Sequence, residues 1–113
     1  MVVETDVSDD EVDRIFRALA DATRRDIVRR TLTAQPSISE LAEYYAMSFA
    51  AVQKHVVVLE KADLITKRTQ GRTTLVTANP VAIARAKGLL DKYEQLWHSR
   101  VTQLDSLLAQ ESP

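Results

Sequence analysis

The chain has 113 residues, no cysteine and a formal net charge of −1, with 45% hydrophobic residues. This length allows one domain with a modest core, so we expect residues 1–113 to form a single domain, and the lack of cysteine excludes disulfides, thiolate metal sites and a cysteine nucleophile. The acidic start has no long apolar run, which argues against a secretion signal or a membrane span and favours a cytoplasmic protein.

Two helices are expected in the first third of the chain. Ser8 can cap a helix over residues 8–20, with Glu11 as its reciprocal partner and Val7 and Val12 at the staple positions. Asp21 can cap a second helix over residues 22–33. The acidic residues near the start are therefore explained by helix capping and by the helix dipole.

The next two helices are separated by a very short connection. Ser37 and Glu40 form a capping box for a short helix that ends at Tyr44 or Tyr45. Ala46 and Met47 then connect it to a fourth helix, which Ser48 caps and Asp63 ends. Val52, Val56 and Leu59 recur at helical spacing and predict one buried stripe on that helix.

A hairpin and a long helix complete the chain. Residues 64–68 and 73–78 are rich in β-branched side chains, and Gly71 between them suits the turn of a hairpin. Asn79 and Pro80 open a last helix of about 30 residues, reaching Gln110. The predicted fold is mainly α with a β-hairpin wing, a winged helix-turn-helix of about five helices.

In such a unit the second helix buries its back on the core and presents its N-terminal front to the major groove of DNA. Gln can pair with adenine, Phe and Ala can meet the thymine methyl, and Lys can reach guanine or phosphate. Basic residues on the hairpin suit phosphate. The residues expected to bind DNA are Ser48, Phe49, Ala50, Gln53, Lys54, Val57, Arg68 and Arg72.

Charge distribution supports a polyanionic partner. Residues 1–13 hold six acidic side chains and no basic one, so the rest of the chain carries 10 acidic against 15 basic residues, a net charge of +5. Many of the basic residues lie between positions 24 and 72. Among them are Arg24, Arg25, Arg29, Arg30, Lys54, Lys67, Arg68 and Arg72. The alternative is an ordinary solvated surface.

Three stretches of the chain resemble the ArsR-type bacterial winged-helix transcriptional repressors. They are FRALADATRRDIV (16–28), SISELAEYYAMSFAAVQKHVVVLEKADLI (37–65) and KRTQGRTTLVT (67–77). The resemblance implies a homodimer that represses a promoter and is released by a signal. This chain departs from the family in having Ala22 in place of Pro, Ala46 and Asp63 in place of Gly, and Phe49 in place of a polar residue.

Metal sensing and catalysis find little support in the sequence. The best-known members of the family sense metals through Cys residues or through paired Asp and His residues on the last helix. This chain has no Cys, and its last helix offers Asp91, Glu94 and Asp105 with His98 as its single His, so we expect no metal and no other cofactor. We read His55 as a packing residue, with a phosphate contact as the alternative. No nucleophile and base can be paired, so we expect no catalytic residues and no enzyme.

The last helix carries more apolar surface than a small core needs. Leu90, Tyr93, Trp97, Arg100, Leu104 and Leu107 alternate steps of three and four residues. We therefore expect a homodimer through the first and last helices, with recognition helices about 34 Å apart. The expected interface residues are Ile15, Leu90, Tyr93, Trp97, Val101, Leu104 and Leu108. The alternatives are a helix that covers only its own domain and a small apolar effector bound near Trp97 and Tyr93.

Two classes of function follow from this sequence. The first is a sequence-specific DNA-binding transcriptional regulator that acts as a homodimeric repressor. The second is a winged-helix adaptor that binds another protein. Lys54, Arg68 and Arg72 favour DNA, because an adaptor would be expected to carry acidic or apolar residues at those positions.

Overall fold

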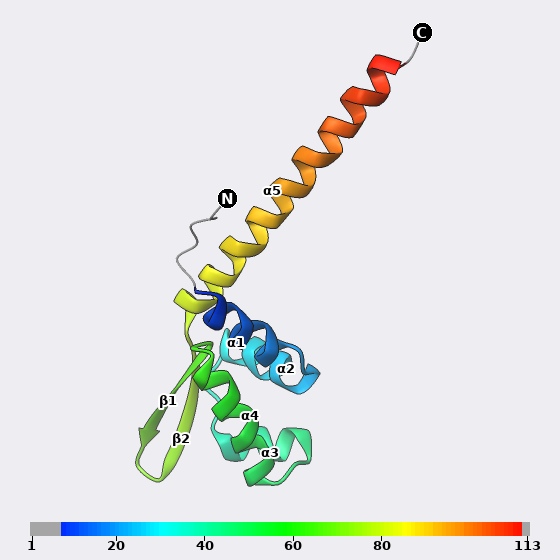
Figure 1. The fold of residues 1–113 in the computed structure, drawn as a ribbon. Coiled ribbons are helices and arrows are strands. Elements are labelled where there is room, and N and C mark those ends of the chain that lie inside the picture. The colour runs from blue at the N-terminus through cyan, green and yellow to red at the C-terminus, as the bar shows by residue number, and fades with distance from the viewer. Residues whose placement is uncertain (1–7, 112–113) are drawn as a thin grey trace.

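The computed structural model describes residues 8–111 and has five helices and one hairpin (Figure 1). The helices are α1 (Asp9–Leu19), α2 (Ala22–Thr31), α3 (Ile38–Tyr45), α4 (Phe49–Lys61) and α5 (Pro80–Glu111). Strands β1 (Ile65–Gln70) and β2 (Thr73–Ala78) form an antiparallel pair. This order of elements confirms the predicted winged helix-turn-helix.

Side-chain caps set the starts of the first four helices, as the sequence predicts. Asp21 accepts a hydrogen bond from the amide of Arg24 at 3.0 Å, and Ser48 accepts one from the amide of Ala51 at 3.1 Å. Ser37 and Glu40 form the full capping box of α3. Ser8 accepts from the amide of Glu11, but the Glu11 carboxylate lies 3.9 Å from Arg85 of α5. Val7, the expected staple residue, lies outside the described residues.

The core lies where α1, α2, α3 and α4 meet the hairpin and the first turns of α5. Ile27, Leu41 and Leu59 are among its largest fully buried side chains. Ala82 is also in the core, and Ile83 and Ala86 pack against it. Beyond Leu89, α5 leaves the body and projects as a single straight helix (Figure 1). The molecule is consequently elongated, with extents of 73 × 28 × 21 Å.

Helix and strand ends differ from the prediction by one or two residues. Strand β1 continues to Gln70 rather than ending at Arg68, because Gln70 pairs with Thr73 and leaves only Gly71 and Arg72 as the loop. Gly71 has a φ of 63° at the first loop position, which is the pattern of a two-residue type II′ turn.

Candidate nucleic-acid interface

A three-residue connection sets the angle between α3 and α4. Ala46 adopts the left-handed conformation, with φ 53° and ψ 42°, and the amide of Met47 donates to the carbonyl of Ala42 at 3.0 Å. A residue other than glycine pays about 1–2 kcal/mol for this conformation. The family that the chain resembles often has Gly at this turn, and Ala46 takes the left-handed conformation that suits Gly.

Helix α4 has one buried face and one open face. Val52, Val56 and Leu59 are fully buried. On the other side Ser48, Phe49, Ala50, Gln53 and Lys54 are exposed, and Val57 is half-buried. Phe49, at the first position of the helix, keeps 50% of its surface exposed. The open face therefore offers an aromatic ring, an amide and an ammonium group side by side at the start of the helix.

The hairpin is attached to the start of α3, so its position relative to α4 is fixed. The amide of Val76 donates to the carbonyl of Pro36 at 2.8 Å, and Ser37 forms an isolated bridge with Leu75. Lys67 of β1 lies 3.3 Å from the carboxylate of Glu60 at the end of α4. The hairpin is thus joined to the start of α3 by backbone contacts and to α4 by an ion pair.

The two wing arginines differ in their surroundings. Arg72 stands in the two-residue loop at the tip of the hairpin and is exposed. Arg68 lies on β1 and donates from Nη2 to the Gln35 side chain at 3.0 Å, which directs it toward the loop before α3. Arg72 is the freer of the two to meet a phosphate.

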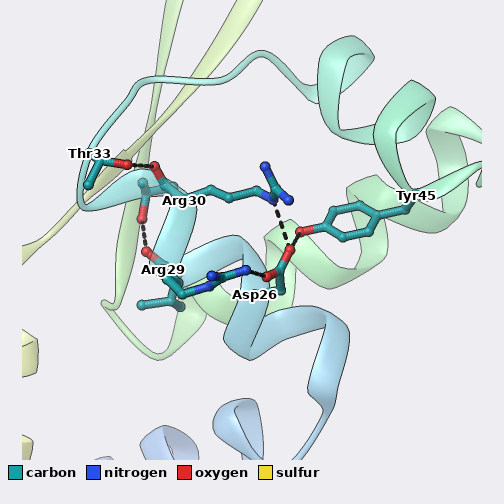
Figure 2. Close-up of polar contacts among 7 residues, drawn as sticks. Asp26, Arg29, Arg30, Thr33 and Tyr45 are labelled. Atoms are coloured by element: carbon teal, nitrogen blue, oxygen red, sulfur yellow. Dashed lines mark hydrogen bonds and ion pairs between the residues drawn. The ribbon is translucent and has the colours of Figure 1, made fainter.

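Asp26 joins α2 to α3 through a network that sequence reasoning missed (Figure 2). Its carboxylate accepts hydrogen bonds from Arg29, from Arg30 at 2.8 Å and from the hydroxyl of Tyr45 at 2.5 Å. These bonds, that from Tyr45 first, hold the pKa of Asp26 well below its ordinary value. Burial and the bond to Asp26 raise the pKa of Tyr45 to about 12. Arg30 also lies over the Tyr44 ring, 3.5 Å from its centroid. The spacing of Asp26, Arg29 and Arg30 could have indicated the ion pairs, but no local pattern points to Tyr45.

Most of the basic residues counted toward a polyanion partner are engaged inside the chain. Arg24 donates from Nε to the carbonyl of Ala18 at 2.7 Å, and Arg25 donates to the carbonyl of Leu19 at 2.8 Å. These two side chains therefore satisfy the C-terminal carbonyls of α1. Arg29, Arg30 and Lys67 have carboxylate partners, as described above. The other three are Lys54 on the open face of α4, Arg72 at the tip of the hairpin, and Arg68, whose hydrogen-bond partner Gln35 is neutral.

His55 lies on the half-buried edge of α4. Its Nδ1 is 3.4 Å from Nη1 of Arg24 and 3.9 Å from the carboxylate of Asp21. These contacts connect α4 to the start of α2.

The expected interface residues of α5 lie on its projecting part. Leu90, Tyr93, Trp97, Leu104 and Leu108 are all more than half exposed, with Trp97 at 65%, and Val101 is half-buried. Ile15 does not fit the expectation: it is only 4% exposed, because it faces the core of its own chain. Phe16, its neighbour on α1, is exposed and offers the accessible apolar surface that was expected of Ile15.

His98 on α5 was the single histidine weighed above as a metal ligand. His98 Nε2 lies 3.5 Å from Glu94, and no group of three or more His, Cys, Asp or Glu side chains in residues 8–111 is arranged around a metal position. None of the helices in this range combines the length and the apolar character needed to cross a membrane.

The chain is similar to known transcriptional regulators in both sequence and structure. No family model matches the chain. It is 33% identical over 99 residues to the HTH-type transcriptional regulator Rv2034 of Mycobacterium tuberculosis, covering 88% of this chain and 90% of that protein. A solved ArsR family transcriptional regulator is 29% identical with a TM-score of 0.76, over 82% of this chain and 96% of the other.

Two further structures share the fold. An ArsR-like transcriptional regulator from Rhodococcus sp. RHA1 has a TM-score of 0.80 at 24% identity, over 90% of this chain and 94% of the other. A winged helix-turn-helix DNA-binding domain from Mycobacterium bovis, described as homodimeric, has a TM-score of 0.63 at 19% identity. The match covers 84% of this chain and 91% of the other. The chain therefore belongs to the ArsR-type winged helix-turn-helix transcriptional regulators.

Proposed function

We propose that the protein binds an operator as a homodimer and represses the adjoining promoter until a signal releases it. As a member of this family, the chain is a DNA-binding transcriptional regulator, which favours this function over a protein-binding adaptor. The observation that carries the proposal is the open face of α4, where Phe49, Gln53 and Lys54 are exposed while Val52, Val56 and Leu59 of the same helix are fully buried.

The residues have distinct roles in this proposal. The start of α4 enters the major groove, where Gln53 and Phe49 contact base edges and Ala50 and Val57 give shape to the contact. Ser48 and the first amides of the helix meet a phosphate. Lys54, Arg68 and Arg72 approach the backbone on either side of that groove.

The proposed dimer uses α5 and α1. Trp97 and Leu104 of α5 anchor it, and Phe16 of α1 takes the place expected of Ile15. Two-fold symmetry then presents two recognition helices to successive major grooves, about 34 Å apart. The regulator acts in the cytoplasm, performs no catalysis and needs no metal.

Selection of bound sequences from random duplex DNA tests the proposal. The wild-type protein is expected to enrich a two-fold symmetric sequence whose half-sites are about one helical turn apart. Phe49→Ala is the informative variant, and Leu32→Ala is a control because Leu32, directly after the end of α2 and outside the recognition helix, is a similarly exposed apolar residue. Enrichment of no sequence by the wild type would favour the adaptor. A non-symmetric motif would contradict the dimer and leave DNA binding intact.

A further inference from the structure

The apolar stripe of α5 is continuous but changes its environment along the helix. We call Leu90, Tyr93, Trp97, Arg100, Leu104 and Leu107 the α5 seam. Ile83 and Ala86 precede the seam at the same alternating spacing and pack against the core of the same chain. From residue 90 to residue 110, no described side chain is buried. The first part of the stripe therefore packs on the body of its own chain. The part from Leu90 onward, which we call bare, is not buried.

We propose that this bare part of α5 pairs antiparallel with α5 of a second copy, in a register that sets Trp97 against the partner's Arg100. The inference rests on the homodimer proposed above and specifies how its long helices meet. In this register Leu90 faces the partner's Leu107, Tyr93 faces the partner's Leu104, and symmetry repeats each pair.

Arg100 determines the direction of the pair. Its spacing places it inside the seam, between Trp97 and Leu104, although the rest of the seam is uncharged. A parallel, symmetric pair would bring Arg100 against the partner's Arg100, so two like charges would be forced together in an apolar environment. The antiparallel pair separates the two guanidinium groups and gives each the face of an indole ring, the best of the aromatic partners for a cation.

The length of the bare segment determines the register. Residues 90–107 span about 26 Å of helix at 1.5 Å per residue. In the proposed register this whole segment faces the same segment of the partner, so every leucine of the seam has an apolar neighbour. A register centred on Trp97 would set Trp97 against the partner's Trp97. Leu107 would then face the partner's Lys87, a residue paired with Asp91, and would stay uncovered.

The absence of cysteine from the sequence makes crosslinking a direct test. The double variant Leu90→Cys with Leu107→Cys is expected to form a disulfide-linked dimer on mild oxidation, because facing seam positions bring Cα atoms within disulfide range. Each single variant should stay uncrosslinked. The matched control is Gln95→Cys with Thr102→Cys: in this register those residues lie at the same level along the pair but on the faces turned away from it.

Each crosslinking result decides a separate point. Crosslinking of Leu90→Cys by itself would mean a parallel pair, and crosslinking of Trp97→Cys by itself would mean the register centred on Trp97. A dimer in sedimentation that the double variant does not crosslink would place the interface elsewhere. All three would overturn the proposed pairing while leaving the homodimer intact. A wild-type monomer at micromolar concentration would contradict the homodimer itself, with DNA binding assayed separately.

A mixing experiment tests the contact between Trp97 and Arg100. Trp97→Leu removes the ring and Arg100→Met removes the charge, and each keeps apolar bulk in the seam. When the two variants are mixed, the heterodimer regains one complete pair, so it should exceed the half of the population expected from random exchange. The two residues are also neighbours on their own helix, but that contact is broken in both variants alike. Random exchange would show that the two side chains do not meet across the dimer.

Discussion

The hydroxyl of Tyr45 in α3 donates a 2.5 Å hydrogen bond to the carboxylate of Asp26 in α2. The same carboxylate accepts from Arg29 and Arg30, so one acidic side chain holds three donors from two helices. Because α3 and the turn after it orient α4, this bond helps to fix the orientation of α4.

Tyr45→Phe should lower the free energy of unfolding by about 1.5–3 kcal/mol, because it removes a hydrogen bond to a charged group in a half-buried site. Urea denaturation measures this change. Tyr44→Phe is the control: Tyr44 is exposed and Arg30 lies over its ring, which the substitution keeps. Equal losses in the two variants would contradict a special role for the Tyr45 hydroxyl.

The same network predicts a pH dependence of stability. The folded-state pKa of Asp26 lies below its ordinary value of 3.8, chiefly because of the hydrogen bond from Tyr45. Its stabilisation is therefore fully present above that ordinary value and is lost as the pH falls toward the folded-state pKa. The unfolding free energy of the wild type should exceed that of Asp26→Asn by a constant amount between about pH 5 and 7, and this difference should shrink below about pH 4. If the difference in unfolding free energy between the wild type and Asp26→Asn grew on acidification, a lowered folded-state pKa of Asp26 would be contradicted.

The recognition helix and the wing tip should respond differently to substitution. Gln53→Ala should change the preferred base at one position of each half-site, at a cost of about 1–3 kcal/mol in discrimination. Arg72→Ala should weaken binding to the operator and to a scrambled duplex alike, and should lower the salt slope by about 1 for each subunit. Affinity for both duplexes, measured across a salt series, gives both quantities.

Lys87→Ala is the control for lost positive charge. Lys87 is exposed and pairs with Asp91 on α5, a helix that leaves the body at the end away from the wing tip (Figure 1). Its removal should leave the salt slope unchanged. An unchanged slope in Arg72→Ala as well would remove the wing tip from the DNA contact.

Ala46→Gly should stabilise the protein. Ala46 has a φ of 53°, a left-handed conformation that costs a residue with a Cβ about 1–2 kcal/mol. The greater freedom of Gly in the unfolded chain offsets about 0.4–1 kcal/mol of this, so we expect a net gain of roughly 0.5–1 kcal/mol in urea denaturation. Ala84→Gly, at an exposed position inside α5, should instead lose roughly 0.5–1 kcal/mol. Destabilisation by both changes would mean that the turn tolerates Ala without strain.

Divalent metals should not release the protein from DNA. Within residues 8–111 no cluster of metal-binding side chains is formed, and the chain has no cysteine. Adding Zn²⁺, Ni²⁺ or Cd²⁺ should therefore leave operator affinity at the value measured with a chelator present. Stoichiometric metal binding with loss of DNA affinity would contradict this, and His98→Ala would show whether its imidazole is a ligand.

Local sequence patterns predicted the helices and the hairpin because their causes are local. Ser37 with Glu40 caps α3, and Gly71 turns the hairpin, through contacts within a few residues. The contacts that a side chain makes depend on distant parts of the chain, so they were harder to predict. Arg24 resembled a DNA contact by charge, yet it satisfies carbonyls of α1.

Ile15 illustrates the same limit at the interface. The sequence shows that α1 has an apolar face, but it does not tell which of its residues face the chain's own core and which face outward. The fold buries Ile15 and leaves Phe16 exposed. The individual DNA contacts and the α5 pairing stay predictions, since both depend on a molecule beyond the single chain.

The projecting part of α5 would make the amount of the proposed dimer depend on the total protein concentration. Most helical stability in proteins comes from packing, and none of the described side chains of α5 beyond Leu89 is buried in one copy. In the proposed dimer, the outer turns of α5 therefore become ordered only when two chains meet, and dilution lets them fray and lowers the helical signal. At low abundance the concentration of paired chains rises with the square of total protein. Operator occupancy would then rise steeply with expression, even without a ligand.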